Sequence, residues 1–186
     1  MKKGSIIILV IVVAIIFFWG MGSYNGLVTS QENVNTQWAN VQNQYQRRAD
    51  LIPNLVETVK GYAKHEKETL ERVISARNAA ASATTMEGRV EGENALQSTL
   101  KSLFAIAEAY PDLKANTNFL SLQGDLQRIE DEIANSRKYY NAIVKTYNTK
   151  REVFPSSIVA GMFHFEKKPL FEVGSEAERE NVKVQF

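Results

Sequence analysis

Arg47, Arg48 and Asp50 stand just before Pro53 in the stretch QYQRRADLIPNLVETVKG, and their side chains suit several kinds of chemistry. Two guanidinium groups beside a carboxylate are typical of an anion site or of a catalytic ion pair. They are equally typical of a structural ion pair, because an arginine buried between helices needs a carboxylate partner. The pattern of the surrounding helices decides between these interpretations.

Arg48 falls on an apolar seam of helical period, and this position favours the structural interpretation. We expect Arg48 and Asp50 to pair and to hold a corner between two helices. Arg47, Pro53 and Arg137 complete the predicted polar corner, with Arg137 contributed by a later helix. Three further carboxylates are candidate partners for the arginines: Glu57, Glu130 and Asp131.

His65-Glu66 resembles half of a zinc-protease signature, but Thr69 occupies the position of the second histidine in H-E-x-x-H. The other histidine, His164, lies far along the chain at no metal-binding spacing. The chain has no cysteine, which excludes thiolate metal sites and cysteine catalysis. No nucleophile elbow, Walker loop or dinucleotide fingerprint is present. We therefore expect no enzyme, with no catalytic, cofactor-binding or metal-binding residues and no cofactor.

The charges are balanced, with 22 basic and 21 acidic residues spread along the chain. A nucleic-acid-binding domain normally has a basic surplus, so we expect no nucleic-acid partner. Lys2 and Lys3 precede an uncharged segment, which leaves 20 of the 22 basic residues beyond it. The rest of the chain is therefore nearly neutral and offers no field for electrostatic steering.

The segment from Gly4 to Gly22 contains no charged residue. At ~1.5 Å per residue it reaches about 28 Å, close to the ~30 Å hydrocarbon core of a bilayer. Trp19 lies at its far edge, where an aromatic anchor is expected. The predicted membrane-spanning residues are Ile6, Ile7, Ile8, Leu9, Val10, Ile11, Val12, Val13, Ala14, Ile15, Ile16, Phe17, Phe18 and Trp19.

Lys2 and Lys3 flank the predicted span on its N-terminal side, and the next basic residue is Arg47. The positive-inside rule then places the N-terminus in the cytoplasm and the remainder of the chain on the other side of the membrane. A cleaved signal peptide is the alternative, since Gly20 and Gly22 are small residues at its end. The G-x-x-x-G spacing from Gly22 onward fits either close helix packing or a flexible joint.

Beyond the span, apolar residues recur at alternating steps of four and three. This seam runs through Leu27, Gln31, Val34, Trp38, Val41, Tyr45, Arg48, Ile52, Leu55, Val59, Tyr62, Glu66, Thr69, Val73, Ala76 and Ala80. The phase continues past Pro53, so the chain either forms one kinked helix or turns near Ala49-Asp50. We favour the turn, with Asp50 as the N-cap and Pro53 in the first turn, because it yields two helices of bundle length.

Two more seams follow a short loop that begins within Ala79 to Thr85. The third contains Leu96, Leu100, Leu103, Ala107 and Tyr110, and the fourth contains Phe119, Leu122, Leu126, Ile129, Ile133, Tyr140, Val144 and Tyr147. Asn116, Thr117 and Asn118 are candidate caps of the fourth helix. The prediction is an all-α chain in which a single transmembrane helix precedes an antiparallel, up-and-down four-helix bundle of long helices.

The segment from Phe154 to Phe186 is apolar without a helical period and is expected to be an irregular tail. It either packs over the bundle or is an interaction segment, and its aromatic residues beside Lys167 and Lys168 also suit a membrane interface. The expected division is an anchor over 1–22, a helical bundle over 23–153 and the tail over 154–186.

The chain resembles the LemA family over nearly its whole length. The resemblance rests on Tyr24-Asn25, on Trp38-Ala39, on QYQRRADLIPNLVETVKGY, on Ser136-Arg137 with Tyr140-Asn141 and on Tyr147-Asn148. It implies a bacterial single-span membrane protein with a helical-bundle domain and no established enzymatic activity. Together with the positive-inside rule, it places the bundle on the outer or periplasmic side of a bacterial inner membrane. It also implies an association with membrane metalloproteases.

Two functions follow as expectations. The first is a non-enzymatic scaffold, a homo-oligomer in contact with the lipid bilayer, that organises or remodels the bacterial envelope membrane. The second is an adaptor or sensor that works with a membrane protein partner, such as a metalloprotease. The long seams and the anchor favour the first function.

Overall fold

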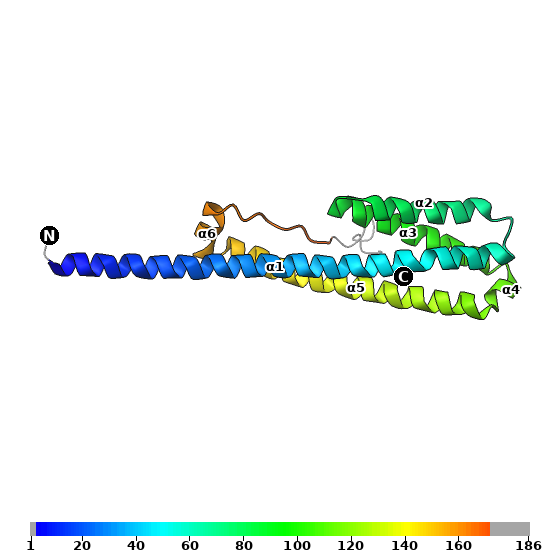
Figure 1. The fold of residues 1–186 in the computed structure, drawn as a ribbon, viewed down its shortest axis with the longest axis horizontal. Coiled ribbons are helices and arrows are strands. Elements are labelled where there is room, and N and C mark those ends of the chain that lie inside the picture. Colours follow the sequence, from blue (N-terminus) through cyan, green and yellow to red (C-terminus); the bar gives the residue numbers. More distant parts are fainter. Residues whose placement is uncertain (1–2, 172–186) are drawn as a thin grey trace, which may run out of the picture. The chain divides into compact units, whose positions relative to one another are not determined.

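The structure is a computed structural model that describes residues 3–171, and helices make up most of this part of the chain. Within it lie six helices: α1 (Lys3–Tyr62), α2 (Lys67–Ser82), α3 (Met86–Ala107), α4 (Pro111–Lys114), α5 (Thr117–Glu152) and α6 (Ser156–Met162). No strand occurs between residues 3 and 171. The predicted all-α class and the single long apolar N-terminal helix are confirmed (Figure 1). The end of the predicted tail, 172–186, lies outside the described residues.

Helix α1 continues without a break through Ala49, Asp50 and Pro53, so the predicted turn at this point is wrong. Pro53 is exposed and cannot donate a hydrogen bond to the carbonyl of Ala49, four residues earlier. The Nε atom of Arg77 in α2 donates to that carbonyl instead, at 2.8 Å. Because the freed carbonyl has a donor from a neighbouring helix, the chain has no need to turn there.

The first turn after α1 lies further along, at Ala63 to Glu66. The amide of Glu66 donates to the carbonyl of Ala63 at 3.1 Å and closes this short connection before α2 begins. Helix α1 also runs unbroken through Gly20, Gly22 and Gly26, where a flexible joint was the alternative expectation.

The chain forms two compact units, and α1 and α5 each contribute to both. Unit 1 comprises Met1–Ala39 with Arg137–Phe186, and unit 2 comprises Asn40–Ser136. This spatial grouping differs from the linear division into 1–22, 23–153 and 154–186 expected from the sequence. Each unit is described by itself below.

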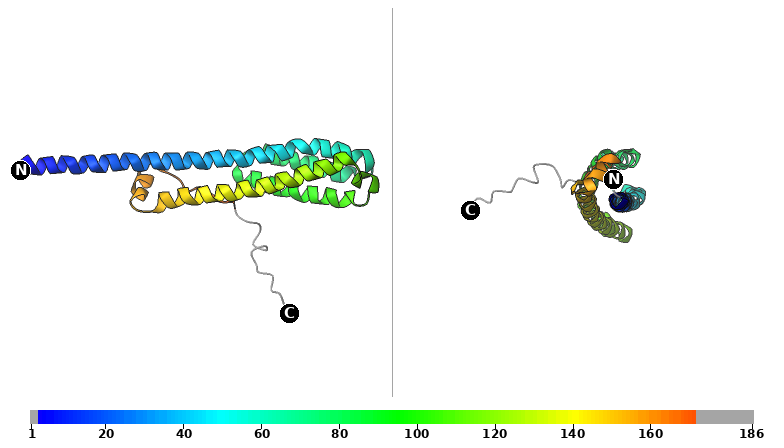
Figure 2. Two further views of the ribbon diagram at one scale, coloured as in Figure 1. Left: turned by 90° about the horizontal axis from the view of Figure 1, so that it is seen from below. Right: turned by 90° about the vertical axis from the view of Figure 1, so that its left-hand side faces the viewer.

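Unit 2 packs its helices around one apolar core. Figures 1 and 2 show α2 and α3 lying alongside the parts of α1 and α5 that belong to this unit. The buried core consists of Ile52, Leu55, Val56, Val59, Ala63, Leu70, Val73, Leu96, Leu100, Leu103, Ala107, Leu113, Phe119 and Leu126. Most of these positions are the ones that the seams predicted. Tyr62 is an exception, since it is 43% exposed at the end of α1.

Helices α2 and α3 approach closely because a glycine stands at their contact. A Cβ atom at Gly92 would lie 2.7 Å from the Cα atom of Ala80, a distance that real contacts do not reach. The loop between these helices is only Ala83–Thr85, shorter than the sequence suggested. Helix α3 starts early because the Thr85 side chain accepts a hydrogen bond from the Gly88 amide at 3.1 Å, which caps the helix. Asn116 caps α5 as predicted and accepts from the Phe119 amide at 2.9 Å.

Unit 1 contains the N-terminal part of α1, the C-terminal part of α5, helix α6 and the segment that follows it. The tail was expected to be irregular, but its first part forms α6, whose Val159 and Ala160 pack against Leu27 of α1. After α6 the chain reverses at His164, whose φ of 55° lies in the left-handed region. Residues 165–171, called the strap below, then run without helix structure.

Candidate functional site

The first candidate site is the apolar N-terminal segment of α1, from Ile6 to Trp19, whose large side chains are left exposed by the residues of unit 1 that the structure describes. The large apolar side chains from Ile6 to Trp19 are between 40% and 65% exposed. Among the described residues, α1 is the helix that is long and apolar enough to cross a membrane, by length and composition. The spanning residues named above all lie in this segment, and their membrane location stays a prediction.

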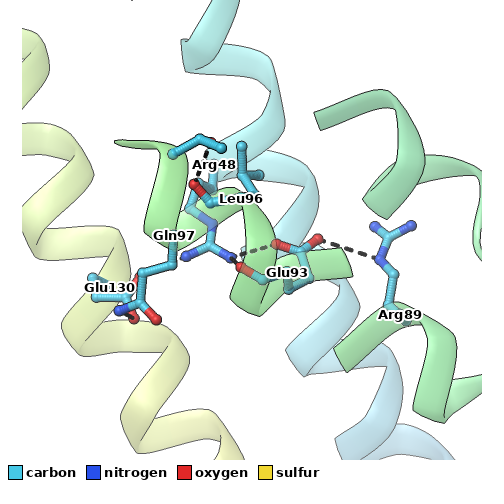
Figure 3. Close-up of polar contacts among 7 residues, drawn as sticks. Arg48, Arg89, Glu93, Leu96, Gln97 and Glu130 are labelled. Atoms are coloured by element: carbon cyan, nitrogen blue, oxygen red, sulfur yellow. Dashed lines mark hydrogen bonds and ion pairs between the residues drawn. The ribbon is translucent and has the colours of Figure 1, made fainter. Parts of the chain in front are cut away.

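The second candidate site is a buried ion-pair cluster in unit 2, formed by Arg48, Arg89, Glu93 and Glu130. Arg48 of α1 is 2% exposed and Glu93 of α3 is 1% exposed. The Nη2 atom of Arg48 donates to the Glu93 carboxylate and, at 3.2 Å, to the Glu93 main-chain carbonyl. The Nη1 atom of Arg48 donates to Oε2 of Glu130 in α5 at 2.6 Å (Figure 3). One guanidinium group therefore joins three helices.

Further polar groups surround this arginine. The Nε atom of Arg89 lies 3.4 Å from Oε1 of Glu93, on the side opposite Arg48 (Figure 3). The side-chain amide of Gln97 donates to Oε1 of Glu130 at 2.8 Å. The guanidinium carbons of Arg48 and Arg89 lie 6.0 Å and 5.8 Å from the centre of the Tyr45 ring. Two positive and two negative groups thus balance within the cluster.

The chemistry open to this cluster is limited by its own pairing. Both carboxylate oxygens of Glu93 face arginines, and the side chain is buried, so the carboxylate is not presented to a substrate in solvent. A cavity of about 130 Å³ adjoins Arg48 and Glu130 and is lined by Gln97, Gln123 and Gln127. Since a water occupies ~30 Å³, this space suits a few waters rather than a cofactor. The geometry fits a structural role that fixes α1 against α3 and α5.

The predicted pairing of Arg48 with Asp50 is wrong. Residues two apart on a continuous helix point to different sides, so the pairing required the turn that α1 does not make. Asp50 is exposed and accepts from the Gln46 amide at 2.7 Å. Glu130 was among the candidate partners, whereas Glu93 was not. Its signal was present in the sequence, since Glu93 lies three residues before Leu96 on the seam of the third helix.

Arg47 and Pro53, two further members of the predicted corner, are not part of the cluster around Arg48. Arg47 is exposed and its Nη1 atom lies 2.6 Å from Oε2 of Glu132. Pro53 faces outward from α1 without joining the cluster. Arg137 belongs to unit 1, where its guanidinium carbon lies 5.5 Å from the centre of the Phe171 ring.

His65 and Glu66, the other chemically suggestive pair, lie in the turn after α1. His65 is exposed, and Glu66 accepts a hydrogen bond from the Tyr110 hydroxyl at 3.1 Å. Desolvation, and then the hydrogen bond and the charge of Glu66, raise the pKa of Tyr110 above its ordinary value. Across residues 3–171 no three histidine or acidic side chains are grouped as metal ligands. Glu66 therefore serves as a link between this turn and Tyr110.

The third candidate site is a pair of asparagines in unit 1 that bind the strap. The Asn141 amide donates to the Phe171 carbonyl at 2.9 Å, and the Phe171 amide donates back to Asn141 Oδ1 at 2.8 Å. Asn148 holds Lys168 in the same two-way manner, at 2.9 Å and 3.0 Å. The two asparagines are seven residues apart on one face of α5. Together they bind the extended backbone of the strap, not its side chains.

Other side chains of α5 complete this attachment. The Tyr147 hydroxyl donates to the Glu166 carbonyl at 2.9 Å, and the Arg151 Nε atom donates to the Phe165 carbonyl at 2.6 Å. Burial raises the pKa of Tyr147, and the Glu166 carboxylate raises it further while Arg151 lowers it. The Phe171 ring closes the strap, with its centre 5.7 Å from Trp38 and 5.0 Å from Tyr140.

A family model supplies the decisive comparison. The model of the LemA family matches residues 37–186, which is most of the chain. The chain belongs to the LemA family. The resemblance expected from the sequence is therefore confirmed. The ion-pair cluster and the strap lie inside the region that defines this family, whereas the apolar part of α1 precedes it.

Individual relatives extend this assignment. The LemA-family chain is 26% identical over 178 residues to Protein LemA of Metamycoplasma hominis, covering 95% of this chain and 81% of that protein. It is 26% identical over 175 residues to Magnetosome protein MamQ 2 of Paramagnetospirillum magneticum. It is 24% identical over 174 residues to Magnetosome protein MamQ of Magnetospirillum gryphiswaldense. Each magnetosome match covers 80% of this chain and 64% of the relative, so the chain spans less than two thirds of those proteins.

Proposed function

We propose that this LemA-family chain is a membrane-anchored helical scaffold that self-associates and organises or remodels a bacterial envelope membrane. The observation that carries the proposal is the contrast within α1. Its apolar part leaves large side chains exposed from Ile6 to Trp19, while Ile52, Leu55, Val56 and Val59 further along the helix are buried in a folded core. One helix is thus suited to lipid at one end and to protein contacts at the other.

The anchor is supported by the free energy of apolar burial. Burying one large apolar side chain is worth roughly 1.5–3 kcal/mol, so the exposed segment as a whole gains tens of kcal/mol by entering a lipid phase. Lys3 lies at its N-terminal end, and no basic residue follows in α1 before Arg47. This charge distribution supports a cytoplasmic N-terminus, with the folded units on the outer side of the inner membrane.

The soluble part is proposed to be an antiparallel four-helix bundle. Support comes from the short connections at Ala63–Glu66 and Ala83–Thr85, because helices joined by a few residues pack as antiparallel neighbours. The core of unit 2 draws on α1, α2, α3 and α5, as such a bundle requires. The buried ion pair between Arg48 and Glu93 supports a rigid framework, since each charge is neutralised by its partner within the bundle.

Self-association is supported by the small residues of α1. A Cβ atom at Gly22 would meet nothing within 4 Å, so the helix surface at this glycine is open to a second backbone, whereas Gly26 is covered by the Lys150 side chain. In membranes such small residues allow helices to approach closely. The MamQ relatives are named for a cellular structure, the magnetosome, and not for a reaction. That naming supports a role in building or organising a structure.

Chemical cross-linking in living cells, followed by mass spectrometry, tests the proposal. The expected main product joins copies of this chain to each other. Stoichiometric capture of one membrane enzyme, such as a metalloprotease, would instead establish the adaptor function and contradict the scaffold. Remodelling is tested separately, by electron microscopy of liposomes that carry the full-length chain. Liposomes of unchanged shape would limit the role to organisation.

A further inference from the structure

Helix α6 and its flanks present apolar side chains that unit 1 leaves exposed. Val159 and Ala160 point inward and are buried, whereas the opposite side of α6 is apolar as well. The exposed side chains are Phe154 (80%), Ile158 (53%), Met162 (68%) and Phe163 (54%). Ile158 and Met162 are four residues apart, on one face of α6, and Phe154 and Phe163 flank the helix at its two ends. We call these four side chains the α6 foot.

The foot lies beside α1 just after its apolar segment. Leu27 of α1 packs against the inner face of α6, and the Tyr24 ring centre lies 4.7 Å from that of Phe163. Figures 1 and 2 show α6 next to α1, just after the C-terminal end of α5. All of these residues belong to unit 1, so their arrangement is fixed within one compact body.

The depth of the foot follows from helix geometry. Tyr24 and Leu27 stand two and five residues beyond Gly22, the end of the uncharged segment. At ~1.5 Å per residue, these contacts lie about 3–8 Å past the hydrocarbon boundary. The interfacial layer extends ~5–7 Å beyond the hydrocarbon core on each side of a bilayer. Helix α6 is therefore held at the depth of the lipid headgroups.

The composition of the foot suits that layer. Aromatic and other large apolar side chains insert at the boundary between headgroups and acyl chains, and lysines nearby reach the phosphates. Lys167 follows the foot and is 65% exposed, with Glu152 as an ion-pair partner at 3.1 Å. Exposed apolar side chains at this depth contact lipid, whereas exposing the same side chains to water would cost free energy.

We propose that the α6 foot is a second membrane contact. It inserts into the headgroup layer of the leaflet at the C-terminal end of the α1 span. The inference rests on the proposed anchor and adds a lipid-binding surface to it. Two contacts on one rigid unit fix the rotation of α1 about its own axis, which a single span leaves free. Every copy of the chain then presents the same face to its neighbours in the membrane.

Site-directed spin labelling of the full-length chain tests this inference, because the chain has no cysteine of its own. Ile158→Cys and Met162→Cys are labelled in vesicles of phosphatidylcholine and phosphatidylglycerol. Tyr139→Cys is the matched control, since Tyr139 is 56% exposed on α5 of the same unit. It lies 13 residues before Glu152, or ~20 Å along the helix. Ile11→Cys reports on the span itself.

Labels at 158 and 162 are expected to collide more with oxygen than with a water-soluble nickel complex, and the label at 139 is expected to show the reverse. Equal, water-like accessibility at 139, 158 and 162, with lipid-like accessibility at 11, would overturn the foot and leave the anchor standing. Water-like accessibility at position 11 would overturn the anchor and the foot together. If the label at 158 is shielded from the nickel complex and this shielding disappears when excess lipid dilutes the chains, the foot contacts a second copy of the chain. That result would overturn the lipid contact.

Discussion

The guanidinium group of Arg48 is bound to both the side chain and the main chain of Glu93, 45 residues away in the sequence. Both residues are almost fully buried, and Glu130 takes the remaining face of the arginine at 2.6 Å. These contacts join α1 to α3 and α5 at one defined register, because the buried guanidinium group is paired with a carboxylate from each of the other two helices. The contacts therefore specify how the helices of unit 2 align.

Replacing Arg48 with methionine should destabilise unit 2 strongly. The change leaves Glu93 buried with only the more distant Arg89, and breaking a buried pair costs ~3–5 kcal/mol. Arg47→Met is the matched control, because the Arg47–Glu132 pair is exposed and should contribute at most ~1 kcal/mol. Denaturant unfolding of the full-length chain in detergent, followed by circular dichroism, gives both values. Equal losses for the two variants would contradict the structural role of Arg48.

Double substitutions separate the partner found here from the one predicted. Arg48→Leu combined with Glu93→Leu should cost less than the sum of the single changes, since no unpaired charge remains between these two residues. Arg48→Leu combined with Asp50→Leu should be additive, because Asp50 is exposed and bound to Gln46. Coupling between Arg48 and Asp50 in the same unfolding measurement would restore the predicted corner.

Gly92→Ala should destabilise the contact between α2 and α3. Its new Cβ atom would meet the backbone of Ala80 at 2.7 Å, and forcing such a contact costs ~1–3 kcal/mol. Gly124→Ala, in an open part of α5, should instead stabilise the helix by ~0.5–1 kcal/mol. Thermal unfolding midpoints that move in opposite directions are the expected result. A neutral Gly92→Ala would show that the two helices can separate freely.

The strap should be released locally by substitution of its asparagines. Asn141→Ala removes the acceptor of the Phe171 amide, and Asn148→Ala removes that of the Lys168 amide. Hydrogen exchange should therefore accelerate at residue 171 in the first variant and at residue 168 in the second. Asn35→Ala, which affects an exposed contact to Glu32, serves as the control. Unchanged exchange in both strap variants would mean that the strap is held by other contacts.

The strap attachment should also weaken at high pH through Tyr147. Burial raises the pKa of Tyr147 in the folded chain above the unfolded value of about 10. The contribution of this hydroxyl is then complete below pH 10 and is lost as the pH rises through the folded-state pKa. Tyr147→Phe should lose ~1 kcal/mol at neutral pH and lose less than wild type on alkaline titration. Tyr139→Phe, at an exposed tyrosine of the same helix, is the control for the loss of a hydroxyl group at neutral pH.

The apolar positions of the fold were predictable because burial follows helical spacing. Val41, Ile52 and Leu55 are buried on the predicted seam of α1. The continuity of α1 was not predictable, because it depends on Arg77, 28 residues away, donating to the carbonyl that Pro53 leaves free. A local pattern does not contain that contact.

The candidate sites, too, were predictable where a residue stands out in the local helical pattern and unpredictable where a contact joins distant parts of the chain. Arg48 could be identified as a buried charge, since it interrupts an apolar seam. Its partner Glu93 depended on an early start of α3, which the cap between Thr85 and Gly88 provides. The two strap-binding asparagines could have been singled out by their spacing of seven residues. The segment that they bind could not be predicted, because they contact its main chain and its sequence has no periodic pattern.

The central claim, that this chain forms a self-associating membrane scaffold, is tested most directly by counting its copies. The full-length chain, at its native density, is extracted with its surrounding lipid into polymer-bounded discs, and the mass of each complex is measured by native mass spectrometry. The scaffold account predicts complexes that contain two or more copies of the chain. A strict monomer in every disc would contradict it.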